Sequence, residues 1–245
     1  MKKLAIIPAR YESSRFPGKP LINLLGKSMI QHVFERVSKA SIFDKVVVAT
    51  DDDRIAEHVK SFGGNVMITS DHHKSGTERC GEVVKTLNEY EVVVNIQGDE
   101  PLVDPKQLAQ LVGAFQDNEV DIATLGTSQI AEGELEDDNR IKVVTDYKGD
   151  ALYFSRNKIP FERNENGYPY MRHIGLYGFR CATLNKLIDS PATKLEEVES
   201  LEQLRWLYYG YSIRVVETDI ETPNIDVPED VDHVLKVMKN QLREE

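Results

Sequence analysis

The chain has 245 residues, of which 40% are hydrophobic and 29% charged, a composition ordinary for a globular protein. This length is sufficient for one large α/β domain or two small ones. Asp and Glu total 41 against 30 Lys and Arg, and the formal net charge of −11 argues against a nucleic-acid partner, because an acidic protein gains no general attraction to a phosphate backbone.

The cellular compartment is predicted from what the sequence lacks. Cys80 and Cys181 lie far apart without a CxxC or metal-ligand spacing, as expected of reduced thiols. The first apolar run, from Leu4 to Ile7, stops at Pro8 and is too short for a signal-peptide core. No other segment approaches the ~20 apolar residues of a membrane helix. We therefore expect a cytoplasmic protein with no membrane partner.

In the first half, short apolar runs alternate with amphipathic stretches. The runs predict strands at 4–8, 46–50, 65–68 and 92–96. The amphipathic stretches predict helices at 29–38 and 53–62, within 75–87, and at 105–115. Continuous rather than alternating apolar runs are typical of a parallel sheet covered on both faces, so the pattern predicts a doubly wound α/β fold.

The second half has a different pattern. Strands are expected at 141–145, 151–154, 172–179 and 212–217. A long helix is expected over Leu195–Tyr209 and a closing helix over Pro228–Lys239. Between them, Lys158–Tyr170 is rich in Pro, Gly, Asn and charge, which predicts a loop that is exposed or reaches a neighbouring subunit.

The loop after the first strand is the first candidate site, because ligands of doubly wound sheets bind at the carboxyl ends of the strands. It carries three cations, two hydroxyls and a glycine: Arg10, Arg15, Lys19, Ser13, Ser14 and Gly18. Guanidinium and ammonium groups suit a polyphosphate. The spacing alone is equally compatible with a solvated basic loop.

Acidic residues supply the second candidate site. Asp99 directly follows the fourth expected strand beside a glycine, where a carboxylate can hold Mg²⁺ together with substrate phosphates. Asp226 is a second candidate, although its local sequence favours a turn or N-cap role. Asp51–Asp53 is interpreted as a helix cap and His72–His73 as a polar turn.

Several motifs together resemble one family. They are IPARYESSRFPGKPL (7–21), VATDD (48–52), SGTERC (75–80), VNIQGDEP (94–101), ALYFSR (151–156), RHIGLYGFR (172–180), LESLEQLRWL and NIDVPED. In this order, over nearly the whole chain, they resemble the 3-deoxy-manno-octulosonate (Kdo) cytidylyltransferases, also called CMP-Kdo synthetases, of the nucleotide-diphospho-sugar transferase superfamily. The first and fourth motifs are shared more widely among sugar nucleotidyltransferases, whereas SGTER, LYFSR, RH-IG-Y (within 172–177) and LEQLR make the resemblance specific.

The resemblance implies a Rossmann-like three-layer α/β fold with a mixed, mostly parallel sheet and a small β-rich dimerisation extension. Residues 1–245 would form a single nucleotidyltransferase domain, with a CTP-binding half at 1–125 and a sugar-binding and dimerisation half at 126–245. The expected assembly is a homodimer.

The resemblance also implies a role for particular residues. The CTP phosphates would bind Arg10, Ser14, Arg15 and Lys19, and the cytidine and its surroundings Ser75, Gly76, Arg79 and Gln97. Mg²⁺ would bind Asp99 and Asp226, and Kdo would bind Arg156, His173, Tyr177, Glu202 and Gln203. Arg10, Arg15, Lys19 and Asp99 would be catalytic. Where the family usually reads VDTPED, this chain has IDVPED (225–230), which keeps the aspartate but lacks the threonine hydroxyl.

The implied reaction is attack by the 2-hydroxyl of Kdo on the α-phosphate of CTP, with release of pyrophosphate. Mg²⁺ would neutralise the phosphates and the cations of the first loop would stabilise the leaving pyrophosphate. Two alternatives stay open: a cytidylyltransferase for another acidic sugar, such as sialic acid or an amino analogue of Kdo, and a catalytically silent nucleotide-binding protein on the same fold.

Overall fold

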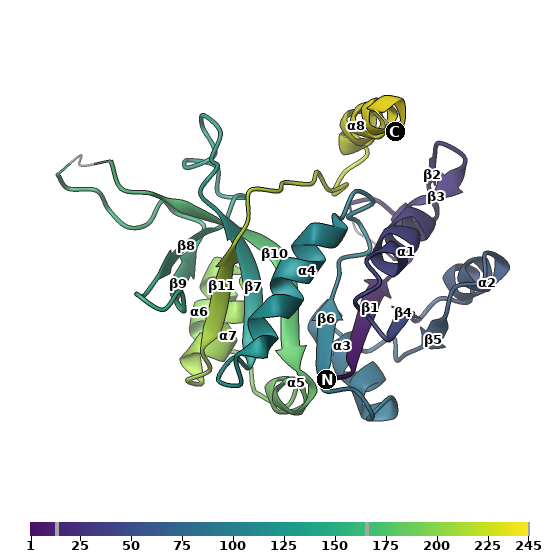
Figure 1. Cartoon of the computed structure of the whole chain (residues 1–245), viewed down its shortest axis with the longest axis horizontal. Coiled ribbons are helices and arrows are strands. Elements are labelled where there is room, and N and C mark those ends of the chain that lie inside the picture. Colours follow the sequence, from purple (N-terminus) through teal and green to yellow (C-terminus); the bar gives the residue numbers. More distant parts are fainter. Residues whose placement is uncertain (13–14, 165–166, 245) are drawn as a thin grey trace. The chain divides into compact units, whose positions relative to one another are not determined.

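The apolar runs of the N-terminal half form parallel strands, of which all but the run at 66–68 are buried. The computed structural model describes residues 1–12, 15–164 and 167–244, excluding the side chains of residues 242 and 244. Its backbone gathers into two units, one formed by Met1–Ala109 with Glu221–Glu245 and the other by Gln110–Ile220 (Figure 1). The C-terminal segment therefore returns to the N-terminal unit.

In the first unit, parallel strands adjoin in the order β6-β1-β4-β5. Their bounds are β1 Lys3–Ala9, β4 Lys45–Thr50, β5 Val66–Ile68 and β6 Val92–Asn95. The helices are α1 Met29–Lys39, α2 Asp53–Ser61 and α3 Gly76–Thr86, and α4 Pro105–Gly113 crosses the boundary between the units. Both α1 and α3 pack against β1 and β4. The predicted elements of this half are confirmed.

Side-chain caps fix where these helices begin. Ser28, Asp52 and Ser75 each precede a helix and accept a hydrogen bond from a first-turn backbone N–H. Asp52 thus has the capping role predicted for the Asp51–Asp53 run. Gly63, with φ +80°, follows the end of α2, as expected of a glycine that stops a helix in the left-handed conformation.

In the second unit, strands adjoin in the order β11-β7-β10-β8-β9. β11 is parallel to β7, and the other pairs are antiparallel. The bounds are β7 Ile122–Thr127, β8 Lys142–Thr145, β9 Ala151–Ser155, β10 Met171–Arg180 and β11 Ile213–Glu217. The helices are α5 Cys181–Leu187, α6 Lys194–Glu199 and α7 Gln203–Tyr208. The α/β fold with a mixed, mostly parallel sheet is confirmed, whereas β7 and α5 were not predicted.

The single helix expected over Leu195–Tyr209 is wrong. Ser200 has φ +51° and ends α6 in the left-handed conformation, so α7 is a separate helix. The Arg156 guanidinium explains the break: its Nε donates to the Glu199 carbonyl at 2.6 Å and its Nη2 to the Ser200 carbonyl at 3.4 Å. A side chain from a neighbouring strand therefore satisfies carbonyls that a continuous helix would use itself.

The closing helix α8, Asp230–Glu244, anchors the C-terminal segment to the first unit. The segment shares an apolar cluster with the loop after β1 and the start of α1, made of Leu24, Met29, Leu102, Ile225, Val234 and Met238. Four shorter elements complete the structure: the 3-10 turns Lys19–Leu21 (η1) and Ala114–Gln116 (η2), and the hairpin of β2 Asn23–Leu24 and β3 Lys27–Ser28. This packing fixes the approach of residues 221–226 to the sheet edge.

Two expectations about composition can be compared with the structure. Cys80 and Cys181 are buried thiols. Within the described part of the chain, no helix has both the length and the apolar character needed to cross a membrane.

Two glycines of β10 give a matched test of the packing. A Cβ at Gly178 would lie 2.7 Å from Cε2 of the buried Phe115, whereas a Cβ at Gly175 would meet no described atom within 4 Å. We expect Gly178→Ala to lower the free energy of unfolding by about 1–3 kcal/mol, because a packed ring must move. Gly175→Ala, the control, should change it little. Denaturant titration measures both, and equal losses would contradict this account of the core.

Candidate active site

The loop after β1 folds back on a tyrosine. Gly18 has φ +72° and its N–H donates to the Tyr11 carbonyl at 2.9 Å. A side chain at position 18 would lie 3.2 Å from the Tyr11 ring, whose other contact is the Arg54 guanidinium 3.3 Å from the ring centroid. Glycine is therefore required for both its conformation and its small size. The turn directs the basic residues of the loop toward the carboxyl ends of β1 and β6.

A cavity of about 540 Å³ opens at this edge of the first unit. Its lining comprises Pro8, Ala9, Arg10, Glu12, Arg15, Lys19, Pro20, Met29, Lys74, Gly76, Gln97, Gly98 and Asp99. The structure thus brings together the predicted residues Arg10, Arg15, Lys19, Gly76, Gln97 and Asp99. Ser14, also predicted here, lies outside the described residues. Four of the lining residues are Lys or Arg, a charge balance suited to a polyphosphate.

Lys19 connects the two predicted metal-binding acids. Its Nζ donates to Asp99 Oδ2 at 2.7 Å and to the Ile225 carbonyl at 2.8 Å, and it lies 3.7 Å from Asp226 Oδ1. The Ile225 N–H donates in turn to the Asp99 carbonyl at 3.0 Å. Asp99 and Asp226 therefore lie within reach of a single cation, although they are far apart in the sequence.

Asp226 does not take the capping role that its local sequence favours. Asp230 Oδ2 accepts the backbone N–H groups of Asp226 and Val227 at 2.7 and 3.0 Å. The Asp226 carboxylate is thereby left to approach Lys19 and, at 3.6 Å, Arg15 Nη2. Asp230 is the residue that shapes this turn.

Burial makes the acidic edge of the cavity costly to ionise. It raises the pKa of Asp99, opposed by the Lys19 ammonium and reinforced by the Asp226 carboxylate. Burial also raises the pKa of the neighbouring Glu100 to about 8, with Asp99 adding to the effect. Carboxylates in such surroundings gain from a cation, which Lys19 supplies here.

At this edge of the cavity, the carboxylates of Asp99 and Asp226 are two groups available to bind a metal. Among the described residues, no group of three or more His, Cys, Asp or Glu side chains is arranged to hold an ion. Two carboxylate ligands fit Mg²⁺, which usually keeps several waters and takes its remaining oxygens from substrate phosphates. The donor set therefore suits a metal that arrives with a nucleotide better than a metal held by protein ligands alone.

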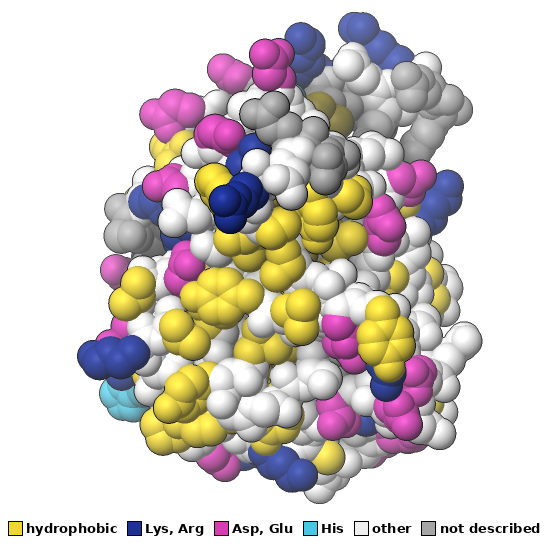
Figure 2. All heavy atoms as spheres, turned by 90° about the vertical axis from the view of Figure 1, so that its left-hand side faces the viewer, with side chains coloured by type: hydrophobic (Ala, Val, Ile, Leu, Met, Phe, Trp, Pro, Cys, Tyr) yellow, Lys and Arg dark blue, Asp and Glu magenta, His cyan; other side chains and the backbone are white. Residues whose placement is uncertain are grey.

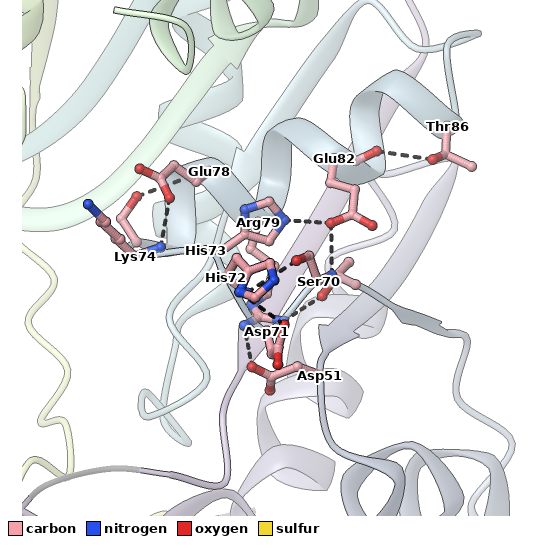
Figure 3. A network of polar contacts seen from close by, with 12 residues as sticks. Asp51, Ser70, Asp71, His72, His73, Lys74, Glu78, Arg79, Glu82 and Thr86 are labelled. Atoms are coloured by element: carbon pink, nitrogen blue, oxygen red, sulfur yellow. Dashed lines mark hydrogen bonds and ion pairs between the residues drawn. The ribbon is translucent and has the colours of Figure 1, made fainter. Parts of the chain in front are cut away.

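A polar network supports the cavity from α3 (Figure 3). Arg79 is completely buried, and its guanidinium donates to Thr69 Oγ1 at 2.5 Å and Asp51 Oδ2 at 2.8 Å. Ser75 caps α3 through the N–H of Glu78 at 3.2 Å. Of the predicted cytidine-binding residues, Gly76 and Gln97 thus line the cavity, whereas Ser75 and Arg79 organise the loop and helix beside it.

Several members of this network have no functional role predicted from their local sequence. Asp51 was assigned to a helix cap, but Asp52 caps α2 and Asp51 pairs with Arg79. His73 was assigned to a polar turn, yet its ring contacts Glu82 and its carbonyl accepts from Arg10. The basic loop after β1 indicates that the residues packed around it matter for function, but these pairings form only in the folded chain.

Two of the predicted sugar-binding residues lie together in the second unit. The Thr124 hydroxyl donates to the Leu176 carbonyl at 2.8 Å, so His173 Nε2 must donate the 2.9 Å hydrogen bond to Thr124 Oγ1. The His173 ring lies 5.3 Å from that of Tyr177, which packs edge-on against Trp206 at 5.0 Å. Burial raises the pKa of Tyr177, and Glu202 adds to the effect. Both side chains are therefore neutral groups held by their neighbours.

The other predicted sugar-binding residues lie at the ends of α6 and α7. Glu202 and Gln203 stand at the start of α7, and Gln203 is buried. The Arg156 guanidinium donates to the carbonyls of Asp138, Glu199 and Ser200. Arg156 therefore already stabilises the end of α6, whatever it contacts in addition.

An α/β sheet with a basic loop and an acid pair at the carboxyl ends of its strands defines a nucleotidyltransferase type of site. Residues 4–218 match the family model described as cytidylyltransferase. The chain belongs to the cytidylyltransferase family.

Individual relatives narrow the comparison. The chain is 49% identical to a 3-deoxy-manno-octulosonate cytidylyltransferase of Bacteroides thetaiotaomicron, over 98% of this chain and 100% of that protein. It is 46% identical to an 8-amino-3,8-dideoxy-manno-octulosonate cytidylyltransferase of Shewanella frigidimarina, over 94% of this chain and 96% of that protein. A solved structure of a CMP:2-keto-3-deoxy-manno-octonic acid synthetase complexed with CTP superposes with a TM-score of 0.94 at 40% identity, covering 98% of this chain and all of that one.

The buried His173 should make the stability of the protein depend on pH. Burial lowers its pKa to about 3, with Arg172 adding to the effect, whereas an unfolded histidine titrates near 6.5. Between these values the unfolded chain binds the extra proton, so stability should fall as pH falls, by up to ~1.4 kcal/mol per pH unit from this residue. Denaturation of His173→Gln from pH 6 to 4.5 should show a shallower slope than wild type.

The exposed His72 supplies the control, and His72→Gln should keep the wild-type slope. Parallel curves for wild type and His173→Gln would contradict the assignment of a neutral, buried His173.

Proposed function

We propose that the protein transfers CMP from CTP to Kdo, giving CMP-Kdo and pyrophosphate, and so activates Kdo for lipopolysaccharide biosynthesis. The observation that carries the proposal is the position of Lys19 between Asp99 and Asp226 in a cavity lined by basic residues. The relatives named for Kdo cytidylyltransfer match nearly the whole chain and support the choice of sugar.

Each set of cavity residues has a task in this reaction. Arg10, Arg15 and Lys19 would bind the triphosphate and stabilise the charge that grows on the departing pyrophosphate. Asp99 and Asp226 would hold Mg²⁺. The metal, when bound, would neutralise the phosphates and acidify the attacking hydroxyl. The protein itself contributes by holding two anionic substrates side by side, although they would repel each other in water.

The acid pair gives the direct test. Asp99→Asn and Asp226→Asn keep the shape of each side chain but remove its charge, so each should lower Mg²⁺-dependent pyrophosphate release from CTP and Kdo by about 100-fold or more. Asp232→Asn, at an exposed acid of α8, is the matched control and should retain activity. Turnover near wild type in either site variant would remove that acid from the metal site.

The amino sugar is a second candidate substrate because its enzymes match this chain at 46% identity over nearly the same length. Comparing kcat/KM for Kdo, its 8-amino analogue and sialic acid in the same assay decides among them. Kdo should give the largest value. Silence with every sugar, despite CTP binding, would favour the catalytically silent nucleotide-binding protein instead.

We also propose a cytoplasmic homodimer joined through the second unit. Viewed from the side of β8 and β9, this face carries a concentration of hydrophobic side chains (Figure 2). Leu152 on β9 is 62% exposed, Val198 on α6 83% and Phe161, in the loop 158–170, 89%. A large apolar surface of this kind is typical of an interface between subunits.

Charge substitutions test the dimer. Leu152→Glu and Val198→Glu should shift the wild-type dimer to monomer in sedimentation or light scattering, because each buries an unpaired charge in the interface. Ile68→Glu, at a 51% exposed residue ending β5 in the other unit, should leave the dimer intact. A monomeric wild-type protein, or dimers of undiminished stability in both variants, would overturn this surface assignment.

A further inference from the structure

The cavity residue Arg10 is oriented by the backbone of another loop. Its Nη2 donates to the carbonyl of His73, in the segment that leads from β5 to α3. Burial lowers the pKa of Arg10, and the neighbouring Arg79 adds to the effect. A carbonyl partner orients a guanidinium without neutralising it, so Arg10 keeps its charge for an anion in the cavity. The direction in which Arg10 points then depends on where residue 73 is held.

Glu82 holds residue 73. From the second turn of α3, its Oε2 accepts the Ser70 N–H at 2.9 Å and contacts His73 Nε2 at 2.5 Å (Figure 3). Burial alone would raise the pKa of Glu82, but these two contacts lower it below its ordinary value. One ionised carboxylate oxygen thus ties both ends of the segment 70–73 to a rigid helix.

The rest of the network makes this loop a fixed support. Arg79, three residues before Glu82 on α3, holds Thr69 and Asp51. Glu78 accepts the Lys74 N–H at 2.7 Å at the other end of the segment. The loop is therefore attached at its start, middle and end: Glu82 holds the His73 side chain, and Glu78 holds the N–H of the peptide whose carbonyl binds Arg10.

We infer that Glu82 is a positioning residue for the nucleotide triphosphate, acting through His73 to fix the guanidinium of Arg10. The inference rests on the proposed function, because it takes the cavity anion to be CTP. Glu82 lies outside the cavity lining, so an effect on binding must be indirect, and we assign it to Arg10.

A double-mutant cycle on CTP affinity tests the inference, measured by calorimetry with Mg²⁺ present. Glu82→Ala should raise the Kd for CTP about tenfold in the wild-type background, since small displacements of a binding group are costly. In an Arg10→Ala background the same change should alter Kd by less than about twofold, because the group it positions is gone. Glu82→Gln, which keeps an oxygen acceptor, should restore most of the affinity.

His73→Ala is the second variant, since it removes the contact with Glu82 but keeps the carbonyl that binds Arg10. It should follow Glu82→Ala in both backgrounds, which keeps the test open if Glu82→Ala does not fold. Thr86→Ala is the control on α3, because Thr86 bonds only the Glu82 backbone carbonyl in Figure 3, and it should bind CTP like wild type.

The outcomes separate the two claims. If wild type binds no CTP, the proposed function fails. If wild type binds CTP but Glu82→Ala and His73→Ala bind as well as wild type, or weaken binding equally with and without Arg10, the positioning role fails and the proposed function stands.

Discussion

The site depends on the contacts made by the Lys19 ammonium. The ammonium is largely buried, and it donates hydrogen bonds to Asp99, in the turn after β6, and to the Ile225 carbonyl in the C-terminal segment. A charge in such a place is stable only if these partners stay in position. The same contacts that satisfy Lys19 therefore bring Asp99 and Asp226 together. The site assembles as the chain folds.

The cations of the cavity are held in two different ways. Lys19 is paired with carboxylates, so an arriving metal or phosphate must compete with an existing ion pair. Arg10 is held by a carbonyl, so its charge is available at once. A site built from both kinds can attract an anion without leaving all of its positive charge uncompensated when empty.

The sequence predicted the fold where one physical signal dominates. Strands covered on both faces are continuous apolar runs, so β1, β4 and β6 were found, and the short apolar run of the partly exposed β5 was found with them. β7 was missed because Thr124, Gly126 and Thr127 interrupt its apolar run, although every residue of the strand is buried. The helix over Leu195–Tyr209 was predicted without its break because the cause, Arg156, follows β9 and is distant in the sequence.

The residues of the site also differ in whether the local sequence could predict them. Asp99 could be found locally, since its position after a buried strand places it at the ligand edge. Asp226 could not, because its neighbours suggest a turn and its approach to Lys19 exists only in the folded chain; the motif resemblance is what predicts it as a metal ligand. Glu82 and His73 left no local signal, because their pairing depends on how a helix packs against the loop before it.

The return of residues 221–245 to the first unit has a consequence for synthesis. A ribosome makes the basic loop early and Asp226 more than two hundred residues later, so the nascent chain carries Lys19 and Asp99 without their partner for most of its translation. Until then the apolar cluster around Leu24 and Met29 also lacks its cover from α8. The N-terminal half therefore emerges with an incomplete cavity edge and an exposed apolar surface, and both are completed only when the last part of the chain packs against the first.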